Sequence, residues 1–276
     1  MLGSIVYYVA PFFSFGPQFV IVMNWFFDFC GSYEGRFGVP IIEQRKRIVH
    51  IHVPKTAGTS LRNALQAALT DKSRLFPHYD EKQFANVDLS QYDVYSGHIG
   101  FDTAIKLDGA LVSVLRDPVD RFLSVYYFWR QLAKSNVENS VNTRLASKYE
   151  LSDFVTLTDV PSLIEEFQNR VTWQIASGFS LAHRVKMREH GMSDLAIFEK
   201  AKNNVPTFSV LGIQEDLVDL EKKISATLGL TIKIPRTNVT DGRMPRDKIP
   251  YSVLRKIEEW VFLDIYLYNY VKGFGK

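Results

Sequence analysis

The sequence predicts an α/β fold in which helices flank a central, mostly parallel sheet as three layers. Three observations lead to that prediction. Short apolar runs rich in β-branched residues recur along the chain, most are followed by a segment of helical period, and no internal repeat or low-complexity tract interrupts the pattern. In sheets of this kind ligands bind beyond the carboxyl ends of the strands, so functional residues are expected there.

Four segments have the composition of strands. They are 48–53 (IVHIHV), 92–96, 110–115 (ALVSVL) and 208–213 (FSVLGI). Each is short, apolar and bounded by polar residues or by Gly and Pro. These four segments supply the predicted sheet.

Helices are predicted between the strands and after them. The first places Leu61, Leu65 and Leu69 on one face, and Pro118 stands at the first turn of another, where proline is favoured. The predicted helices span 59–70, 119–133, 162–177, 194–203, 215–228 and 251–270. Residues 235–250 form a polar loop before the last, long amphipathic helix.

Composition excludes some classes of protein. The chain has 276 residues, of which 46% are hydrophobic and 23% charged, so it can bury a sizeable core. A net charge of +3 with only short basic clusters does not indicate a nucleic-acid partner. A single cysteine, Cys30, allows no intrachain disulfide, which favours a cytoplasmic protein.

Residues 1–45 form an apolar N-terminal extension, and residues 46–276 form the folded domain. No charged residue occurs in 2–27, a length that could span a bilayer, although prolines, a glycine and an asparagine interrupt it. Three interpretations stay open: a membrane-associated segment, a packed extension, or residues upstream of a natural start at Met23. Because the nearest basic residues follow the apolar run, a membrane anchor would leave the domain on the cytoplasmic side.

The segment 53–60 (VPKTAGTS) has the pattern of a P-loop-like anion site. A strand leads through a turn of small residues into a helix, whose N-terminal N–H groups and positive dipole end favour an anion. Lys55 adds a cation, and Thr59 and Ser60 add hydroxyl groups. The usual nucleotide loop has lysine directly after its last glycine, but Thr59 follows Gly58 here. An ordinary strand–helix connection remains the structural alternative.

The PKTAGTS stretch resembles the 5′-phosphosulfate loop of sulfotransferases that use PAPS (3′-phosphoadenosine 5′-phosphosulfate). The resemblance is closest to the branch containing the heparan sulfate 2-O-sulfotransferases and related carbohydrate enzymes. It implies that the loop wraps the 5′-phosphosulfate of the donor, with the lysine at the bridging region. The residues so implied are Lys55, Thr56, Ala57, Gly58, Thr59 and Ser60.

A second anchor is indicated by Arg116 and Ser124, which seven residues separate. Arg116 follows a predicted strand and Ser124 lies about two turns into the next helix, so a guanidinium and a hydroxyl can meet one phosphate. The resemblance implies that both hold the donor's 3′-phosphate. Arg243 belongs to a stretch that resembles the loop over the donor's adenosine. A helix-capping Arg116 with a buried Ser124 is the structural alternative.

His98, in the segment 95–101 (YSGHIGF), resembles the histidine that acts as catalytic base in the 2-O-sulfotransferase branch. A neutral imidazole can take the proton of an attacking hydroxyl. Relatives often have another histidine two residues earlier, where Ser96 stands in this chain. His50 and His52 alternate along the first strand, and a structural role is expected for them.

Together these segments imply a sulfotransferase that moves a sulfuryl group from PAPS to an acceptor hydroxyl on a carbohydrate, by in-line displacement. Lys55 would stabilise charge on the leaving phosphate oxygen, and no metal is expected, since neither CxxC nor HExxH occurs. The alternatives are a P-loop-type nucleotide kinase and a non-catalytic nucleotide- or glycan-binding protein. Expected partners are the acceptor and, through 1–45, a membrane; the oligomeric state is left open.

Overall fold

The computed structural model describes residues 47–84, 88–135, 139–235 and 242–273, all within the unit Arg45–Lys276. Four strands form one sheet in the order β2-β1-β3-β4, and each neighbouring pair is parallel. The strands are β1 (Ile48–Ile51), β2 (Val94–Gly97), β3 (Ala110–Leu115) and β4 (Val210–Ile213). The predicted parallel α/β sheet is therefore confirmed.

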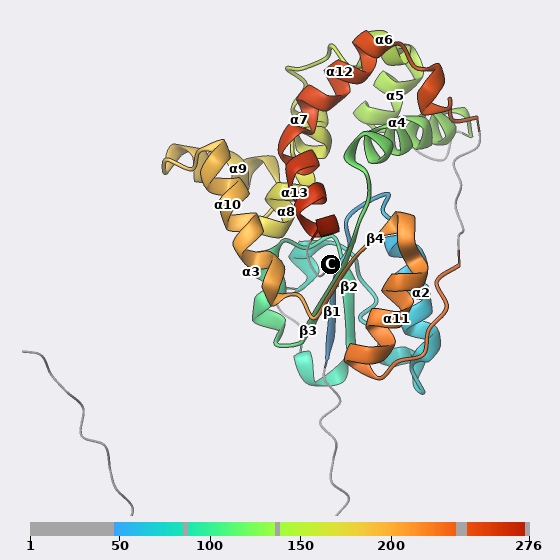
Figure 1. Cartoon of the computed structure of the whole chain (residues 1–276), viewed down its shortest axis with the longest axis vertical. Coiled ribbons are helices and arrows are strands. Elements are labelled where there is room, and N and C mark those ends of the chain that lie inside the picture. Colours follow the sequence, from blue (N-terminus) through green and yellow to red (C-terminus); the bar gives the residue numbers. More distant parts are fainter. Residues whose placement is uncertain (1–46, 85–87, 136–138, 236–241, 274–276) are drawn as a thin grey trace, which may run out of the picture. The chain divides into compact units, whose positions relative to one another are not determined.

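Helices cover both faces of this sheet. On one side lie α2 (Gly58–Ala68) and α11 (Leu217–Leu228), whose leucines pack on alternate strand residues such as Val112 and Val114. On the other lie four helices: α3 (Phe101–Ala104), α8 (Arg170–Ala176), α10 (Asp194–Asn204) and α13 (Phe262–Gly273). Figure 1 shows α2 and α11 on the side of the strands opposite to α3, α8 and α10. The arrangement has three layers, as predicted.

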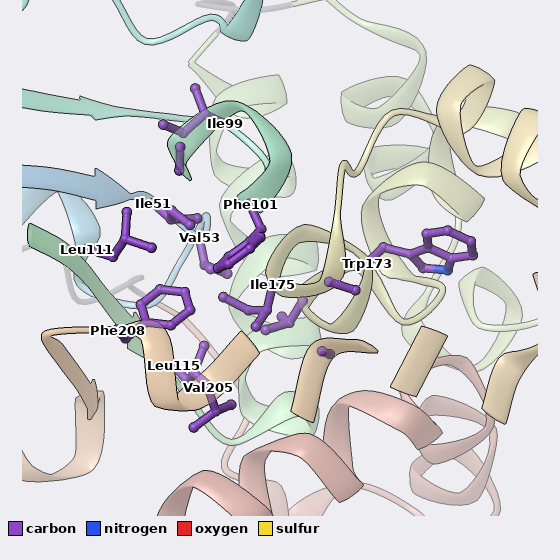
Figure 2. Close-up of a cluster of buried hydrophobic side chains, with 14 of the residues drawn as sticks. Ile51, Val53, Ile99, Phe101, Leu111, Leu115, Trp173, Ile175, Val205 and Phe208 are labelled. Atoms are coloured by element: carbon purple, nitrogen blue, oxygen red, sulfur yellow. The ribbon is translucent and has the colours of Figure 1, made fainter. Parts of the chain in front are cut away.

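The core beneath α8 comes from strand ends and from helix residues far apart in the sequence. Figure 2 shows Ile51, Leu111 and Leu115 of the strands gathered with Ile175 of α8 and with Phe208. These side chains are buried. Burial of apolar surface stabilises the fold by roughly 25 cal/mol per Å². Burial of this cluster therefore holds α8 against the sheet.

A second hydrophobic core is formed by five helices that lie beyond the strands. It joins α4 (Pro118–Lys134), α5 (Val141–Lys148), α6 (Leu151–Phe154), α7 (Pro161–Phe167) and α12 (Tyr251–Trp260). Figure 1 shows these five helices together, beyond the strands. Helix α9 (Leu181–Glu189) follows α8. Short 3-10 helices occupy Lys72–Arg74, Glu81–Phe84, Leu89–Gln91, Ile105–Leu107, Val205–Thr207, Gln214–Asp216 and Arg246–Lys248.

Two predicted helices are each interrupted. The expected 162–177 is divided into α7 and α8, and the expected 251–270 into α12 and α13. Asn169 stands at the first break with φ 51°, a left-handed conformation that asparagine tolerates. Its N–H donates to the carbonyl of Trp260 (3.0 Å), and its Oδ1 accepts from the N–H of Leu263 (2.9 Å). The two breaks thus stabilise each other, which outweighs local helix propensity.

The predicted extension over residues 1–45 lies outside the described residues. So does most of 238–243, the stretch with Arg243 that resembles the loop over the donor's adenosine. Within the part of the chain that is described, no helix is both long and apolar enough to cross a membrane.

Candidate active site

The candidate residues follow the carboxyl ends of three neighbouring strands. The loop 53–57 follows β1, His98 follows β2 directly, and Arg116 follows β3 directly. Because β1 lies between β2 and β3 and all are parallel, the three ends meet at one edge of the sheet. This is the edge where α/β folds bind ligands.

The loop after β1 has an unusual backbone. Lys55 (φ 65°) and Ala57 (φ 68°) both adopt left-handed conformations, which side chains other than glycine rarely take. The hydroxyl of Thr56 donates to the carbonyl of Val53 (2.8 Å) and closes the turn. No side chain in the described structure caps the N-terminus of α2, and the first N–H groups of a helix lack intrahelical partners. The loop thus offers backbone donors to an anion.

Two arginines that follow β3 in the chain donate hydrogen bonds to backbone carbonyls of this loop. Arg116 Nη1 donates to the carbonyl of Lys55 (3.2 Å), and Arg121 Nε donates to the carbonyl of Pro54 (3.0 Å). Both arginines come from the β3–α4 connection and the first turns of α4. The loop's shape therefore depends on the second predicted anchor as well as on its own sequence.

Lys55 directs its ammonium group across the site to α4. Its Nζ lies 3.8 Å from the centre of the Phe128 ring, within cation–π range. Burial lowers the pKa of Lys55 to about 8, and the neighbouring charge of Arg116 contributes to the shift. At pH 7 the lysine still carries its charge, held partly away from water.

The second predicted anchor, Arg116 with Ser124, has Arg243 and Asp120 beside it. Burial lowers the pKa of Arg116, and the charge of Arg243 adds to that shift, so the two guanidinium groups lie within electrostatic reach. Arg243 forms an ion pair with Asp120 of α4. Ser124 is buried on α4. The structure thus places Arg116 and Arg243 together, beside the first turn of the helix that carries Ser124.

Gly58 is required by a close approach. A Cβ atom there would lie 1.9 Å from Cδ2 of His52, a contact that real Cβ atoms do not show. The His52 ring is buried and meets the His98 ring at 4.8 Å between centroids, in an edge-on arrangement. The His52 imidazole therefore packs against both the start of α2, at Gly58, and the predicted base, His98.

His98 is half-buried, and its backbone N–H donates to the carbonyl of Tyr79 (2.7 Å). Burial lowers its pKa to about 4, and among nearby charges Arg170 lowers it most. At neutral pH the imidazole is therefore uncharged and able to accept a proton. His50, in contrast, bonds through Nδ1 to Ser96 Oγ (2.8 Å) inside the sheet, and burial lowers its pKa to about 3.

Sequence reasoning singled out neither Arg121 nor Glu166 near the site, and it expected only a structural role for His52. Arg170 belongs to the stretch 169–178 (NRVTWQIASG), which resembles a family segment on the acceptor side. Arg121 forms a close ion pair with Glu166, and Arg170 Nη1 lies 3.4 Å from the other oxygen of the same carboxylate. Two spacings in the sequence could have indicated that these side chains are neighbours. Glu166 and Arg170 are four residues apart, and Arg121 and Ser124 are three apart on α4. Thr59, one of the predicted loop residues, is exposed.

No group of three His, Cys, Asp or Glu side chains in the described ranges could hold a metal ion. The groups that gather at the sheet edge are cations, hydroxyls, backbone donors and a neutral imidazole, together with the carboxylates of Asp117, Asp120 and Glu166 that pair with arginines. Such a set can bind two anionic groups and accept one proton.

Comparison with known proteins gives one family. The model of the sulfotransferase family (Sulfotransfer_2) matches residues 40–271. One similar solved structure is mouse sulfotransferase SULT7A1 complexed with PAP. Its identity is 16%, its TM-score is 0.35, and the match covers 78% of this chain and 62% of that chain. The chain spans less than two thirds of that relative. No curated protein matches. Because the family model spans most of the chain, including the whole candidate site, the protein belongs to the sulfotransferase family.

Proposed function

We propose that the protein transfers a sulfuryl group from PAPS to an acceptor hydroxyl. The observation that carries this proposal is the convergence of Lys55, Arg116 and His98 at the ends of three adjacent parallel strands. Two of these groups are cations that suit the donor's anions, and the third is a neutral base. Membership of the sulfotransferase family supports the reaction class.

The loop and the β3–α4 segment would divide the donor between them. Backbone N–H groups at the start of α2, with Lys55, would bind the 5′-phosphosulfate, and Thr56 would keep the turn closed. Arg116 and Ser124 would bind the 3′-phosphate, and Arg243 would belong to the loop over the adenosine. The hydrogen bond from Arg116 to the carbonyl of Lys55 couples the two halves (3.2 Å), so filling one half would help to order the other.

In the proposed reaction, His98 takes the proton of the acceptor hydroxyl as its oxygen forms a bond to sulfur. The bond between sulfur and the bridging phosphate oxygen breaks, and the electron pair stays on the phosphate as adenosine 3′,5′-bisphosphate leaves. Lys55 stabilises that developing charge, an effect typically worth about 10²–10³ in rate for one donor. None of these steps assigns a role to a metal.

The acceptor we propose is a carbohydrate hydroxyl, on the sequence resemblance given above. We further propose a cytoplasmic protein, or one in which residues 1–45 associate with a membrane while the catalytic domain stays cytoplasmic. Every residue that we propose to bind PAPS lies after position 45, so a chain that starts near Glu43 should still bind PAPS.

Two assays test the proposed function. Adenosine 3′,5′-bisphosphate should raise the melting temperature of the protein more than ATP with Mg²⁺ does, and ³⁵S-labelled PAPS should label a hydroxylated acceptor. Preference for ATP with Mg²⁺ would favour the kinase alternative. Tight binding of the bisphosphate with no transfer to any acceptor class would favour a non-catalytic binding protein.

A further inference from the structure

Phe128 of α4 is a large apolar side chain that is not used in a hydrophobic core. It is half-buried, and it belongs to none of the three hydrophobic clusters of the described residues. Its neighbours Tyr127 and Trp129, in contrast, pack on the second hydrophobic core. The ring of Phe128 contacts Lys55, whose Nζ lies 3.8 Å from the ring centre. The ring therefore packs on a charged group rather than on apolar ones.

Phe128 belongs to the face of α4 that lies along the loop after β1. Arg121, Ser124 and Phe128 are three and four residues apart, a spacing that places side chains on one side of a helix. Arg121 Nε donates to the carbonyl of Pro54 (3.0 Å), and Phe128 contacts Lys55, the next residue of the loop. Ser124, between them on this face, is a proposed ligand of the donor's 3′-phosphate. The ring thus lies beside the proposed donor site.

The Lys55–Phe128 contact is closer than the other lysine–ring contacts of the described structure. In those contacts the ammonium lies 5.0, 5.7 or 5.8 Å from the ring centre, in the pairs Lys148–Tyr149, Lys202–Phe198 and Lys272–Tyr268. Cation–π attraction is stronger when the cation is partly withdrawn from water. Burial lowers the pKa of Lys55 to about 8, so this ammonium group meets that condition as well as the shorter distance.

The charge of Lys55 is held differently from that of neighbouring arginines. Arg121 forms an ion pair with Glu166, and Arg243 forms one with Asp120, so a carboxylate offsets each guanidinium. For Lys55, no carboxylate of the described residues is among the charges that shift its pKa. An aromatic ring attracts a cation through its quadrupole and carries no net charge. The full positive charge of the lysine therefore remains available to an anion.

Both ends of the Lys55 residue are held in place. Its backbone is left-handed (φ 65°), and its carbonyl accepts a hydrogen bond from Arg116 Nη1 (3.2 Å), while Phe128 contacts its ammonium group. Lysine is among the side chains that lose most conformational entropy when they become ordered. A charge that is ordered in advance needs no reorganisation at the moment of reaction. The ring contact therefore orders Lys55 before a donor binds.

We infer that Phe128 is a positioning residue, whose ring holds the Lys55 ammonium beside the donor loop without neutralising it, ready to stabilise the phosphate oxygen that leaves sulfur. The inference rests on the proposed function, which gives Lys55 that role, and extends it to a residue that touches no reacting atom. An ammonium group has three N–H donors, so one can face the ring while two reach oxygens of the donor. Loss of the ring should therefore slow transfer more than it weakens donor binding.

The test changes the charge distribution of the ring at nearly constant size. Mono-, di- and trifluorophenylalanine, installed at position 128 of the full-length protein, progressively weaken the negative face of the ring. Single-turnover transfer from ³⁵S-labelled PAPS to an ionised nitrophenol, or to water where the phenol is not accepted, should slow step by step. Phe128→Leu should be slowest, about 2- to 30-fold below wild type, the range of cation–π attraction. Phe128→Tyr should keep most of the rate, and affinity for adenosine 3′,5′-bisphosphate should change less than the rate.

Two controls separate positioning from packing. Tyr127 lies next to Phe128 and packs on Tyr126, with 5.0 Å between ring centroids. Tyr127→Leu should lower the melting temperature and leave the transfer rate unchanged. In a Lys55→Met background, Phe128→Leu should slow transfer no further, because the ring then has no cation to hold.

Two results would overturn the inference while the proposed function stands. One is an active protein whose transfer rate stays constant across the fluorinated series. The other is a full additional loss from Phe128→Leu in the Lys55→Met background, which would give Phe128 a role independent of the lysine. Absence of bisphosphate binding and of all transfer by the wild-type protein would instead contradict the proposed function, and the inference with it.

Discussion

The proposed donor side and the proposed acceptor side of the candidate site are built in different ways. On the donor side, the loop after β1 is held through its own carbonyls: Val53, Pro54 and Lys55 each accept a hydrogen bond from a side chain. On the acceptor side, His98 meets His52 by ring contact, and Arg170 shares one carboxylate with Arg121. The loop on the proposed donor side is thus held by hydrogen bonds within the protein, whereas the proposed acceptor side is held by a ring contact and a shared carboxylate.

The largest effect should come from Gly58→Ala, because it strikes the point where both sides touch. The new methyl group would collide with the His52 ring, at 1.9 Å in the present arrangement. Either the loop or the imidazole must move, so donor binding and turnover should both be lost, and overpacking should cost about 1–3 kcal/mol of stability. Calorimetry with adenosine 3′,5′-bisphosphate and thermal unfolding measure the two effects.

Gly273→Ala is the matched control, since a Cβ there meets nothing within 4 Å. It should leave bisphosphate affinity unchanged. If Gly58→Ala binds the bisphosphate and turns over like the control, the His52 ring does not couple the two sides.

Arg116→Ala should affect the donor side selectively. Removing the guanidinium deletes charge-assisted bonds to the 3′-phosphate, each worth about 1.5–3 kcal/mol, so PAPS affinity should fall about 10- to 100-fold. Adenosine 5′-phosphosulfate lacks that phosphate and should lose far less. Isothermal titration with both donors checks this, and similar losses for both would remove Arg116 from the 3′-phosphate site.

The pH dependence of kcat/KM should reflect the ionisation of one group from each side of the site. The pKa of His98 is lowered to about 4, so its neutral form prevails above that pH and is lost as pH falls through it. The pKa of Lys55 is lowered to about 8, so its charge is lost as pH rises through that value. In the free enzyme kcat/KM should therefore fall about tenfold per unit outside this window. If kcat/KM begins to fall as the pH drops below about 6.5, burial does not lower the pKa of His98 as this account requires.

The sequence predicted the donor side more fully than the acceptor side, for a physical reason. The loop is a contiguous segment between a strand and a helix. Strand β3 has the predicted bounds of 110–115, because a short run that is apolar except for Ser113 ends at the charged pair Arg116 and Asp117. Pro118 likewise opens α4 as expected. Local sequence determines these features, so local patterns predict them.

The acceptor side depends on contacts between distant segments. The break at Asn169, which makes Arg170 the first residue of α8, is fixed by bonds to Trp260 and Leu263. No pattern within 162–177 indicates it. Arg121 and Arg170 share the Glu166 carboxylate only because α4, α7 and α8 are packed together. Four helices, α3, α5, α6 and α9, also escaped the sequence prediction.

The most direct test of this division is chemical rescue of His98→Ala and Lys55→Ala. Both variants should transfer slowly to an ordinary alcohol, with His98→Ala losing about 10²–10⁴ in rate, the usual contribution of a general base. A nitrophenol at a pH above its own pKa arrives already ionised and needs no base. Sulfation of that acceptor from labelled PAPS should be partly restored in His98→Ala and should stay slow in Lys55→Ala. Rescue of Lys55→Ala with no rescue of His98→Ala would contradict the account.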